Sequence, residues 1–203
     1  MKVMVFLLPL VMLLAGCEKP APVDYALLVE RDGITYMAYG TDPFTSDATE
    51  SHENGKLKME RHYVNGRLNG FHREWYDNGQ LRAETTFKDG KEDGLQRKWH
   101  ENGQLSEEQT WKDGELDGLA QIWYYNGQLQ FEAPHRNGEL DGLFRSWHKN
   151  GQMSVEETYK DGLRDGLQTI FPEDPDNIFN ILDPIPPKCF ASGKEVDIGE
   201  CAE

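Results

Sequence analysis

The stretch NGQLRAETTFKDGKEDGLQRKW, residues 78–99, carries the pattern from which the architecture of this 203-residue chain can be predicted. Its opening, Asn-Gly followed by Gln or Lys and then Leu or Met, recurs at steps of 24 residues. A fixed period of this length is typical of repeat proteins, in which each unit packs against its neighbours. The copies begin at Asn54, Asn78, Asn102, Asn126 and Asn150.

Each copy contains two more pairs of turn-forming residues. In the quoted stretch these are Asp89-Gly90 and, four residues later, Asp93-Gly94. Asn-Gly and Asp-Gly supply the positive φ angles that tight hairpin turns require, so we expect a turn at every pair. The corresponding pairs in the other copies are Asn65-Gly66, Asn69-Gly70, Asp113-Gly114, Asp117-Gly118, Asn137-Gly138, Asp141-Gly142, Asp161-Gly162 and Asp165-Gly166.

Two segments of strand length lie between these turns, Leu81 to Phe87 and Leu95 to Trp99 in the quoted copy. Alternation places Phe87 and every second residue before it on one face of a strand, with Glu84 on the other. The spacing of the glycines excludes a helix. We therefore predict an all-β fold, an elongated single-layer antiparallel meander of tandem 24-residue β-hairpin repeats.

Three residue types recur at fixed positions and should form columns along the sheet. Two aromatic columns are expected to act as cross-strand ladders that hold a thin sheet together. A glutamate column is expected to pair with neighbouring Lys and Arg or with turn amides. The columns are Tyr63, Phe87, Trp111, His135 and Tyr159; Trp75, Trp99, Trp123, Trp147 and Phe171; and Glu60, Glu84, Glu108, Glu132 and Glu156.

The tryptophans of the second column are the candidate partner-binding residues. If this row is exposed, it suits a protein or a glycan, because aromatic side chains dominate binding hot spots. The alternative interpretation is that the same rings only pack the sheet. The four candidates are Trp75, Trp99, Trp123 and Trp147.

The chain begins with the features of a bacterial lipoprotein precursor. One positive charge precedes the apolar run Val3 to Leu14, and Leu-Ala-Gly leads into Cys17. We predict a signal peptide at residues 1–16, lipidation of Cys17, and a tether at residues 17–24. An ordinary signal peptide and an uncleaved anchor are the alternatives. The expected location is the bacterial cell envelope, lipid-anchored on the periplasmic face or the cell surface.

The repeats are expected to lie between two caps. Residues 25–53 read as an N-terminal capping hairpin with a half-repeat, residues 54–173 as the five repeats, and residues 174–203 as a proline-rich C-terminal cap. An oxidising compartment would join Cys189 to Cys201 in a disulfide.

Charge and motifs argue against an enzyme and against binding of nucleic acid. The formal net charge of −15 repels nucleic acid and attracts basic proteins. The histidines show no metal-ligand spacing, no nucleophile motif appears, and we predict neither a catalytic residue, a metal nor a cofactor. His100 and His148 share one position, for which we expect a solvent-facing place on a strand. Calcium binding at the Asp-Gly turns is disfavoured, because Asn replaces Asp at several of them.

The quoted stretch and its four siblings resemble the MORN-variant repeat of bacterial proteins commonly labelled YwqK-type antitoxins. Leu28 to Thr45, LVERDGITYMAYGTDPFT, is similar to the leader of that family, in which a Pro-Phe-Thr-Gly motif precedes the first repeat. Here Ser46 replaces the glycine. The resemblance covers about residues 25–173 and implies a binding scaffold.

Together these features predict an envelope-anchored repeat scaffold that binds another protein and catalyses no reaction. Its partners would be a protein, with a basic toxin as one candidate, and the membrane through the N-terminal lipid. The alternative is an antitoxin or immunity protein that neutralises a toxin. A third hypothesis is binding of cell-envelope glycan or lipid.

Overall fold

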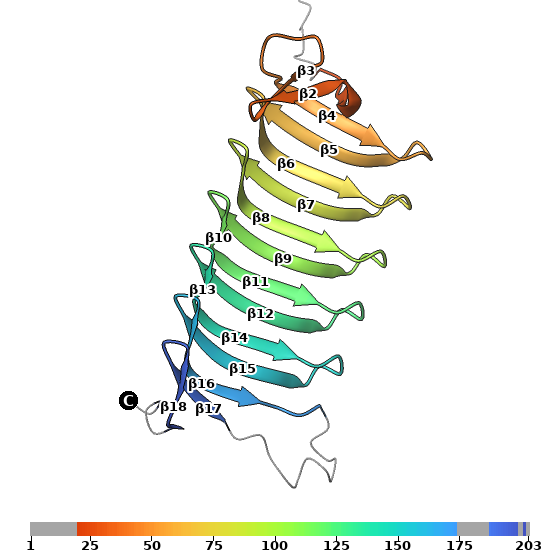
Figure 1. The fold of residues 1–203 in the computed structure, drawn as a ribbon. Helices are drawn as coiled ribbons and strands as arrows, with labels where there is room; N and C mark the ends of the chain where they lie inside the picture. Colours follow the sequence, from red (N-terminus) through yellow and green to blue (C-terminus); the bar gives the residue numbers. More distant parts are fainter. Residues whose placement is uncertain (1–19, 174–186, 199–200, 202–203) are drawn as a thin grey trace, which may run out of the picture.

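A single long sheet dominates the computed structural model, which describes residues 20–173, 187–198 and 201. This sixteen-stranded sheet forms one layer (Figure 1). From β4 (Ser46–Ser51) to β16 (Leu163–Ile170), its successive strands pair antiparallel and in chain order. The predicted all-β meander of tandem repeats is therefore confirmed.

The strands between these two follow the 24-residue period. β10 and β13 are two-residue strands that continue, after one irregular residue, into β11 and β14. The bounds are β5 (Leu57–Val64), β6 (Arg67–Trp75), β7 (Leu81–Lys88), β8 (Lys91–Trp99), β9 (Leu105–Lys112), β10 (Glu115–Leu116), β11 (Gly118–Trp123), β12 (Leu129–Arg136), β13 (Glu139–Leu140), β14 (Gly142–Trp147) and β15 (Met153–Lys160).

The second turn pair of each repeat forms a tight hairpin turn, as predicted. Asp89 and Gly90 have φ angles of 51° and 85°, and the equivalent pairs in the other repeats are alike. Two successive positive φ angles define the type I′ turn, whose twist matches that of the flanking strands. These turns join β5 to β6, β7 to β8, and each later pair of strands.

The prediction of a turn at the third pair is wrong. Asp93 and Gly94 lie inside β8, where the register shifts between Thr85 and Phe87 of the neighbouring strand. Gly94 has a φ of 119°, and a Cβ there would meet the Thr86 Cβ at 3.2 Å. The Asp-Gly pair therefore makes a β-bulge, which needs the same backbone freedom as a turn and increases the local twist.

The first turn pair lies in a longer loop that links each repeat to the next. In the loop after β6, Gly79 N–H donates to Tyr76 O, and Asn78 Oδ1 accepts from Gln80 N–H at 2.8 Å. Asn54 and its equivalents at three of the other four loops donate from Nδ2 to a backbone carbonyl 23 residues ahead. The asparagine therefore closes its own loop and also ties that loop to the next one.

A second inter-repeat tie starts at the residue before each of these loops, where His and Tyr alternate. Tyr76 Oη donates to Trp99 O at 2.7 Å, and His100 Nε2 bonds Trp123 O at 3.1 Å. Tyr124 and His148 continue the series. The expected solvent-facing strand position of the histidines is therefore wrong, because these rings lie just beyond the strands and bind the next repeat.

An apolar cluster covers the N-terminal end of the sheet. Phe44, Ala48 and Tyr63 are buried there, and Phe44 packs edge-on against Tyr63 with ring centroids 5.7 Å apart. The elements over this end are β1 (Val23–Asp24), η1 (Tyr25–Leu27), β2 (Leu28–Arg31) and β3 (Ile34–Met37). β1 pairs with β4 in parallel, and β2 and β3 form a separate hairpin.

The C-terminal end carries the short strands β17 (Lys188–Ala191) and β18 (Lys194–Val196). A disulfide joins Cys189 to Cys201, with 5.9 Å between the Cα atoms. Residues 174–186 of the predicted cap lie outside the described residues, as do the predicted signal peptide, Cys17 and the start of the tether. Within the described part of the chain, no helix is long and apolar enough to cross a membrane.

Candidate binding surface

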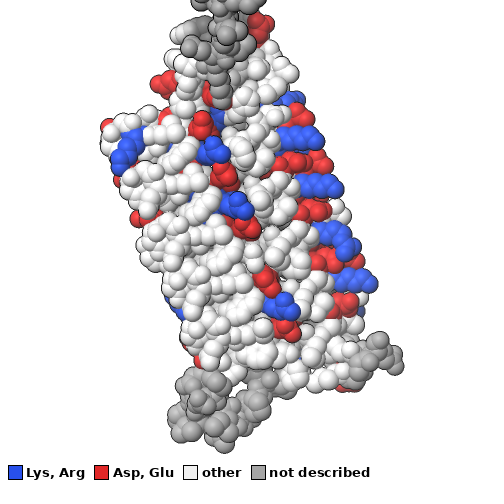
Figure 2. Space-filling view, turned by 180° about the vertical axis from the view of Figure 1, so that it is seen from behind, with Lys and Arg blue, Asp and Glu red and all other residues white. Residues whose placement is uncertain are grey.

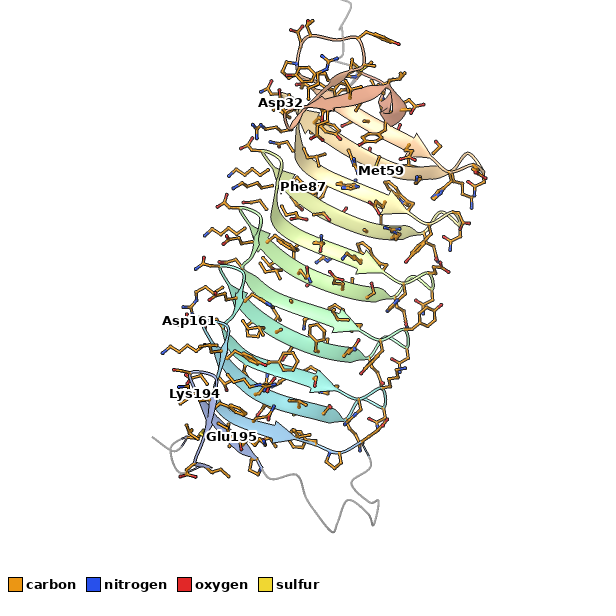
Figure 3. All side chains as sticks on the ribbon, in the orientation of Figure 1. Asp32, Met59, Phe87, Asp161, Lys194 and Glu195 are labelled. Atoms are coloured by element: carbon orange, nitrogen blue, oxygen red, sulfur yellow. A yellow bond between two sulfur atoms is a disulfide. The ribbon has the colours of Figure 1, made fainter. Side chains whose placement is uncertain are left out.

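The sheet has two faces with different chemistry, which we call the groove face and the ladder face. In β7 the groove face carries Ala83, Thr85 and Phe87, and the ladder face carries Glu84 and Thr86. Phe87 and Met59 of the groove face are labelled in Figure 3. Figure 2 views the molecule from behind and shows acidic and basic side chains alternating along the length of the sheet.

The groove face is hollowed over β6 to β9 by an open groove of about 580 Å³. Thr85 and Gln96 line it and are buried, and Gln96 Nε2 donates to Thr85 Oγ1 at 3.3 Å. Phe87, Trp99 and Tyr76 add aromatic surface. The groove therefore combines apolar rings with fixed polar groups, which is the composition of a binding site.

Side chains that line the groove also form ion pairs. Arg82 reaches Glu74 at 2.8 Å, and Lys98 reaches Glu107 at 2.9 Å. Burial lowers the pKa of His72, and the positive charge of Arg61 lowers it further, while Glu74 opposes both effects. The imidazole is therefore disposed to be neutral near pH 7, when it offers one donor and one acceptor.

The groove face becomes apolar toward the C-terminal half of the sheet. Phe144 lies between Phe131 and Tyr159, with ring centroids 5.9 Å and 6.3 Å away. The one buried charge of this region, Glu157, accepts from Tyr159 Oη at 2.7 Å and from Gln168 Nε2 at 2.6 Å. The two halves of this face therefore offer different surfaces to a partner.

The four predicted tryptophans lie at the ends of β6, β8, β11 and β14, where the register shifts before the loops. All four are half-buried. Trp99 lines the large groove, and Trp75 lines a smaller hollow beside Met59 and Glu74. Across the described residues, no ring contact joins two of these tryptophans. The four tryptophans therefore occupy equivalent positions at the strand ends, but their rings do not contact one another.

The aromatic ladders do not form as predicted, for a geometric reason. Members of one column lie two strands apart, about 9.6 Å, whereas paired rings need centroids about 4.5–7 Å apart. A ring on the intervening strand is needed as a bridge. Among the described residues no ring bridges two members of one column. Phe144 of β14 reaches Tyr159 at 6.3 Å between centroids but its other neighbour, Phe131, belongs to neither column, and His72 reaches only Phe87, at 6.1 Å.

The glutamate column pairs with arginine across the sheet, as predicted. On the ladder face, Glu84 bonds Arg73 at 2.5 Å and Glu108 bonds Arg97 at 2.6 Å. Arg145 bridges Glu132 and Glu156 at 3.2 Å and 2.9 Å. Gln121 takes the arginine position between Glu108 and Glu132, and its Nε2 donates to Glu132 at 3.3 Å. We call this row the charge ladder.

One further column, which consists of apolar residues, was not predicted from the sequence. The residue after the third glycine of each repeat is apolar in all five copies. The 24-residue recurrence of this apolar residue is the sequence signal that identifies the column. We call this column the apolar row, and it consists of Phe71, Leu95, Leu119, Leu143 and Leu167.

No set of three or more His, Cys, Asp or Glu side chains in the described part of the chain could hold a metal ion. The arrangement consists of repeated hairpins tied to their neighbours, with broad open faces. These features define a β-repeat scaffold.

The family model of the MORN repeat variant, MORN_2, matches five segments that together make up more than half of the chain. The chain belongs to this family. Each match ends at the first residue of a type I′ turn, and the next match begins two residues after the glycine of that turn. Each later unit is therefore a hairpin around one long loop. The matched residues are 47–65, 68–89, 92–113, 116–137 and 140–161.

Members of this family are non-catalytic repeat scaffolds, and MORN repeats in general mediate interactions with proteins or membranes. No curated protein matches this chain. The function of the chain is therefore that of an interaction scaffold.

Proposed function

We propose that this protein is a lipid-anchored scaffold of the bacterial envelope that binds another protein in the groove of its sheet. The observation that carries the proposal is the groove of about 580 Å³ over β6 to β9, with Trp99 and Phe87 beside buried polar groups. Aromatic side chains supply most of the binding energy at protein interfaces, and fixed polar groups select the partner.

Sequence supports the anchor. The apolar run Val3 to Leu14 is too short for a comfortable membrane span, and small residues precede Cys17. Labelled palmitate should enter the full chain, and the protein should sediment with membranes. Cys17→Ser should abolish both, whereas Cys189→Ser should abolish neither. Sedimentation of Cys17→Ser with membranes without label would contradict lipidation and support an uncleaved anchor.

A photo-crosslinking amino acid tests the protein partner. Placed at Ser106, which lines the groove, it should capture one protein in the native membrane. Placed at Lys112, at the exposed end of the same strand, it should not. Trp99→Ala should weaken capture at Ser106 while the circular dichroism spectrum is unchanged.

Other results point to other partners. No capture at Ser106, with saturable binding of purified cell wall or lipid to the soluble form, would replace the protein partner with an envelope glycan or lipid. Capture of a basic toxin whose activity this chain blocks would support the immunity function, which the net charge of −15 favours. Salt should then weaken the complex strongly.

A further inference from the structure

The apolar row on the ladder face is a second surface that the proposed function does not use. Four of its five members are large apolar residues with exposed side chains, at 49% for Phe71, 40% for Leu95, 42% for Leu119 and 43% for Leu167. Soluble proteins rarely gather exposed apolar side chains in one continuous strip without a partner.

Small side chains fill the spaces within the row. Thr86 pairs with Phe71, Thr110 with Leu95 and Pro134 with Leu119 on the intervening strands. These side chains present methyl and methylene groups rather than charges. The row is therefore a continuous apolar strip that crosses the strands from β6 to β16.

The charge ladder runs beside this strip. Arg73 lies over the Phe71 ring, 4.6 Å from its centroid, so the two rows are in contact. Where other repeats have arginine, the third repeat has Gln121 and the fifth has Thr169. Arg73, Arg97 and Arg145 each pair with a glutamate of the ladder. The flank of the strip is therefore acidic, most of all beside Leu119.

A hollow marks the N-terminal end of the strip. It has a volume of about 290 Å³ and is lined by Phe71, Arg73, Glu60 and His62, among others. A cavity of this size holds one side chain of a partner. The strip therefore offers a row of apolar contacts with an anchoring point at one end.

The spacing of the row selects the shape of the partner. Its members lie two strands apart, about 9.6 Å. Seven residues of an α-helix rise about 10.5 Å, whereas side chains on one face of an extended strand repeat about every 6.7 Å. A helix with one apolar side chain per heptad thus follows the row, and an extended strand does not.

We infer that the apolar row receives an amphipathic α-helix with heptad-spaced apolar side chains and basic side chains along the flank that meets the charge ladder. A second copy could also stack face to face on the row, with its strands in reversed order and its Leu119 over Leu119. This arrangement is disfavoured, because it would place Arg97 opposite Arg145 and Glu84 opposite Glu156, and like charges repel.

The test uses the full chain in phosphatidylcholine nanodiscs, with empty nanodiscs as a control. The probe is a 28-residue helical peptide with leucines at heptad spacing and lysines on one flank. The control peptide has the same composition with leucines every five residues. The first peptide should bind saturably, and the control peptide should bind about tenfold more weakly or not at all.

Variants of the protein locate the contact. The double variant Leu95→Ser/Leu119→Ser should weaken binding by about tenfold or more, whereas Leu57→Ser, a matched change outside the row, should leave it unchanged. Gln121→Arg should weaken binding severalfold at low salt and have no effect at high salt. Circular dichroism should show that all variants are folded.

Three outcomes would overturn the inference. They are absence of binding by the heptad peptide, equal losses with Leu57→Ser and with the row variant, and equal binding of both peptides. Light scattering provides a further check. A dimer that Leu95→Ser/Leu119→Ser dissociates would assign the row to a second copy of this chain instead of a helix.

Discussion

Gly66 shows how closely the N-terminal hairpin approaches the first repeat. Its N–H donates to Phe44 O at 2.7 Å, and its carbonyl accepts from Thr35 N–H at 2.9 Å. A Cβ on Gly66 would stand 2.4 Å from Ile34 Cγ2 and 2.7 Å from Thr35 O. The backbones meet here because glycine has no side chain.

Comparison of Gly66→Ala with Gly138→Ala separates this contact from backbone strain. Gly138 occupies the same turn position with a φ of 83° and nothing within 4 Å of its Cβ position. Both changes should cost about 1–2 kcal/mol from the positive φ angle. Gly66→Ala should cost about 1–3 kcal/mol more from the clash. Equal unfolding free energies in urea would contradict the close contact.

Tyr159 gives a pH dependence that can be measured directly. Burial raises its pKa above the ordinary value of 10.0, and the hydrogen bond to Glu157 raises it further. The folded state therefore holds this proton more tightly than the unfolded state does. The resulting stability is present below pH 10 and is lost as the pH rises through the folded-state pKa.

Glu157→Gln should lower the pKa of Tyr159 toward 10.0, because the negative neighbour is removed while burial remains. Phenolate absorbance at 295 nm, followed with the variant Tyr159→Phe as reference, measures this titration. The pKa of Tyr63, which burial raises, should not change and serves as the internal control. An unchanged Tyr159 titration would count against the hydrogen bond.

At the scale of the strand, the charge ladder has a gap at Gln121, between Glu108 and Glu132. Gln121→Arg would restore the pattern of the other repeats and should raise the unfolding free energy by about 0.5–1 kcal/mol at low salt. Denaturation at low and high salt measures the effect, which screening should remove. Gln121→Leu, which adds no charge, is the control and should show no such salt dependence.

The strands and their turns could be predicted because they depend on local signals. Asp89-Gly90 specifies its turn through two positive φ angles. Asp93-Gly94 has the same composition but makes a bulge, and the dipeptide alone does not distinguish these uses. The 24-residue period also cannot show which rings meet, because Phe144, on the intervening strand, decides whether Phe131 reaches Tyr159. The groove is lined by side chains from three repeats, so no single repeat encodes it.

At the scale of the whole molecule, stability should increase with the number of repeats, because each hairpin contacts only its neighbours. Deletion of residues 92–115 removes one complete period and keeps every later strand in phase. This variant should fold with a single thermal transition, lower by on the order of 5 °C. Its far-ultraviolet circular dichroism per residue should match that of the parent.

The matched control removes residues 92–103, half a period. One strand is then lost, and the strands that follow run in the opposite direction relative to the first ones. The inter-repeat ties at Tyr76, His100 and Asn102 would be lost, because the deletion removes Trp99, His100 and Asn102. This variant should unfold non-cooperatively, and a sharp transition equal to that of the full-period deletion would count against the nearest-neighbour account.

The positions of the first and last strands of the long sheet have a mechanical consequence. β1 lies at one edge of the sheet and β18 at the other, so a line between these two strands crosses the strands that lie between them (Figure 1). A load applied through these two edge strands would open backbone hydrogen bonds one pair at a time rather than shear a whole strand at once. The molecule should therefore lengthen under low force in steps of one hairpin and shorten again on release, as a reversible extension spring.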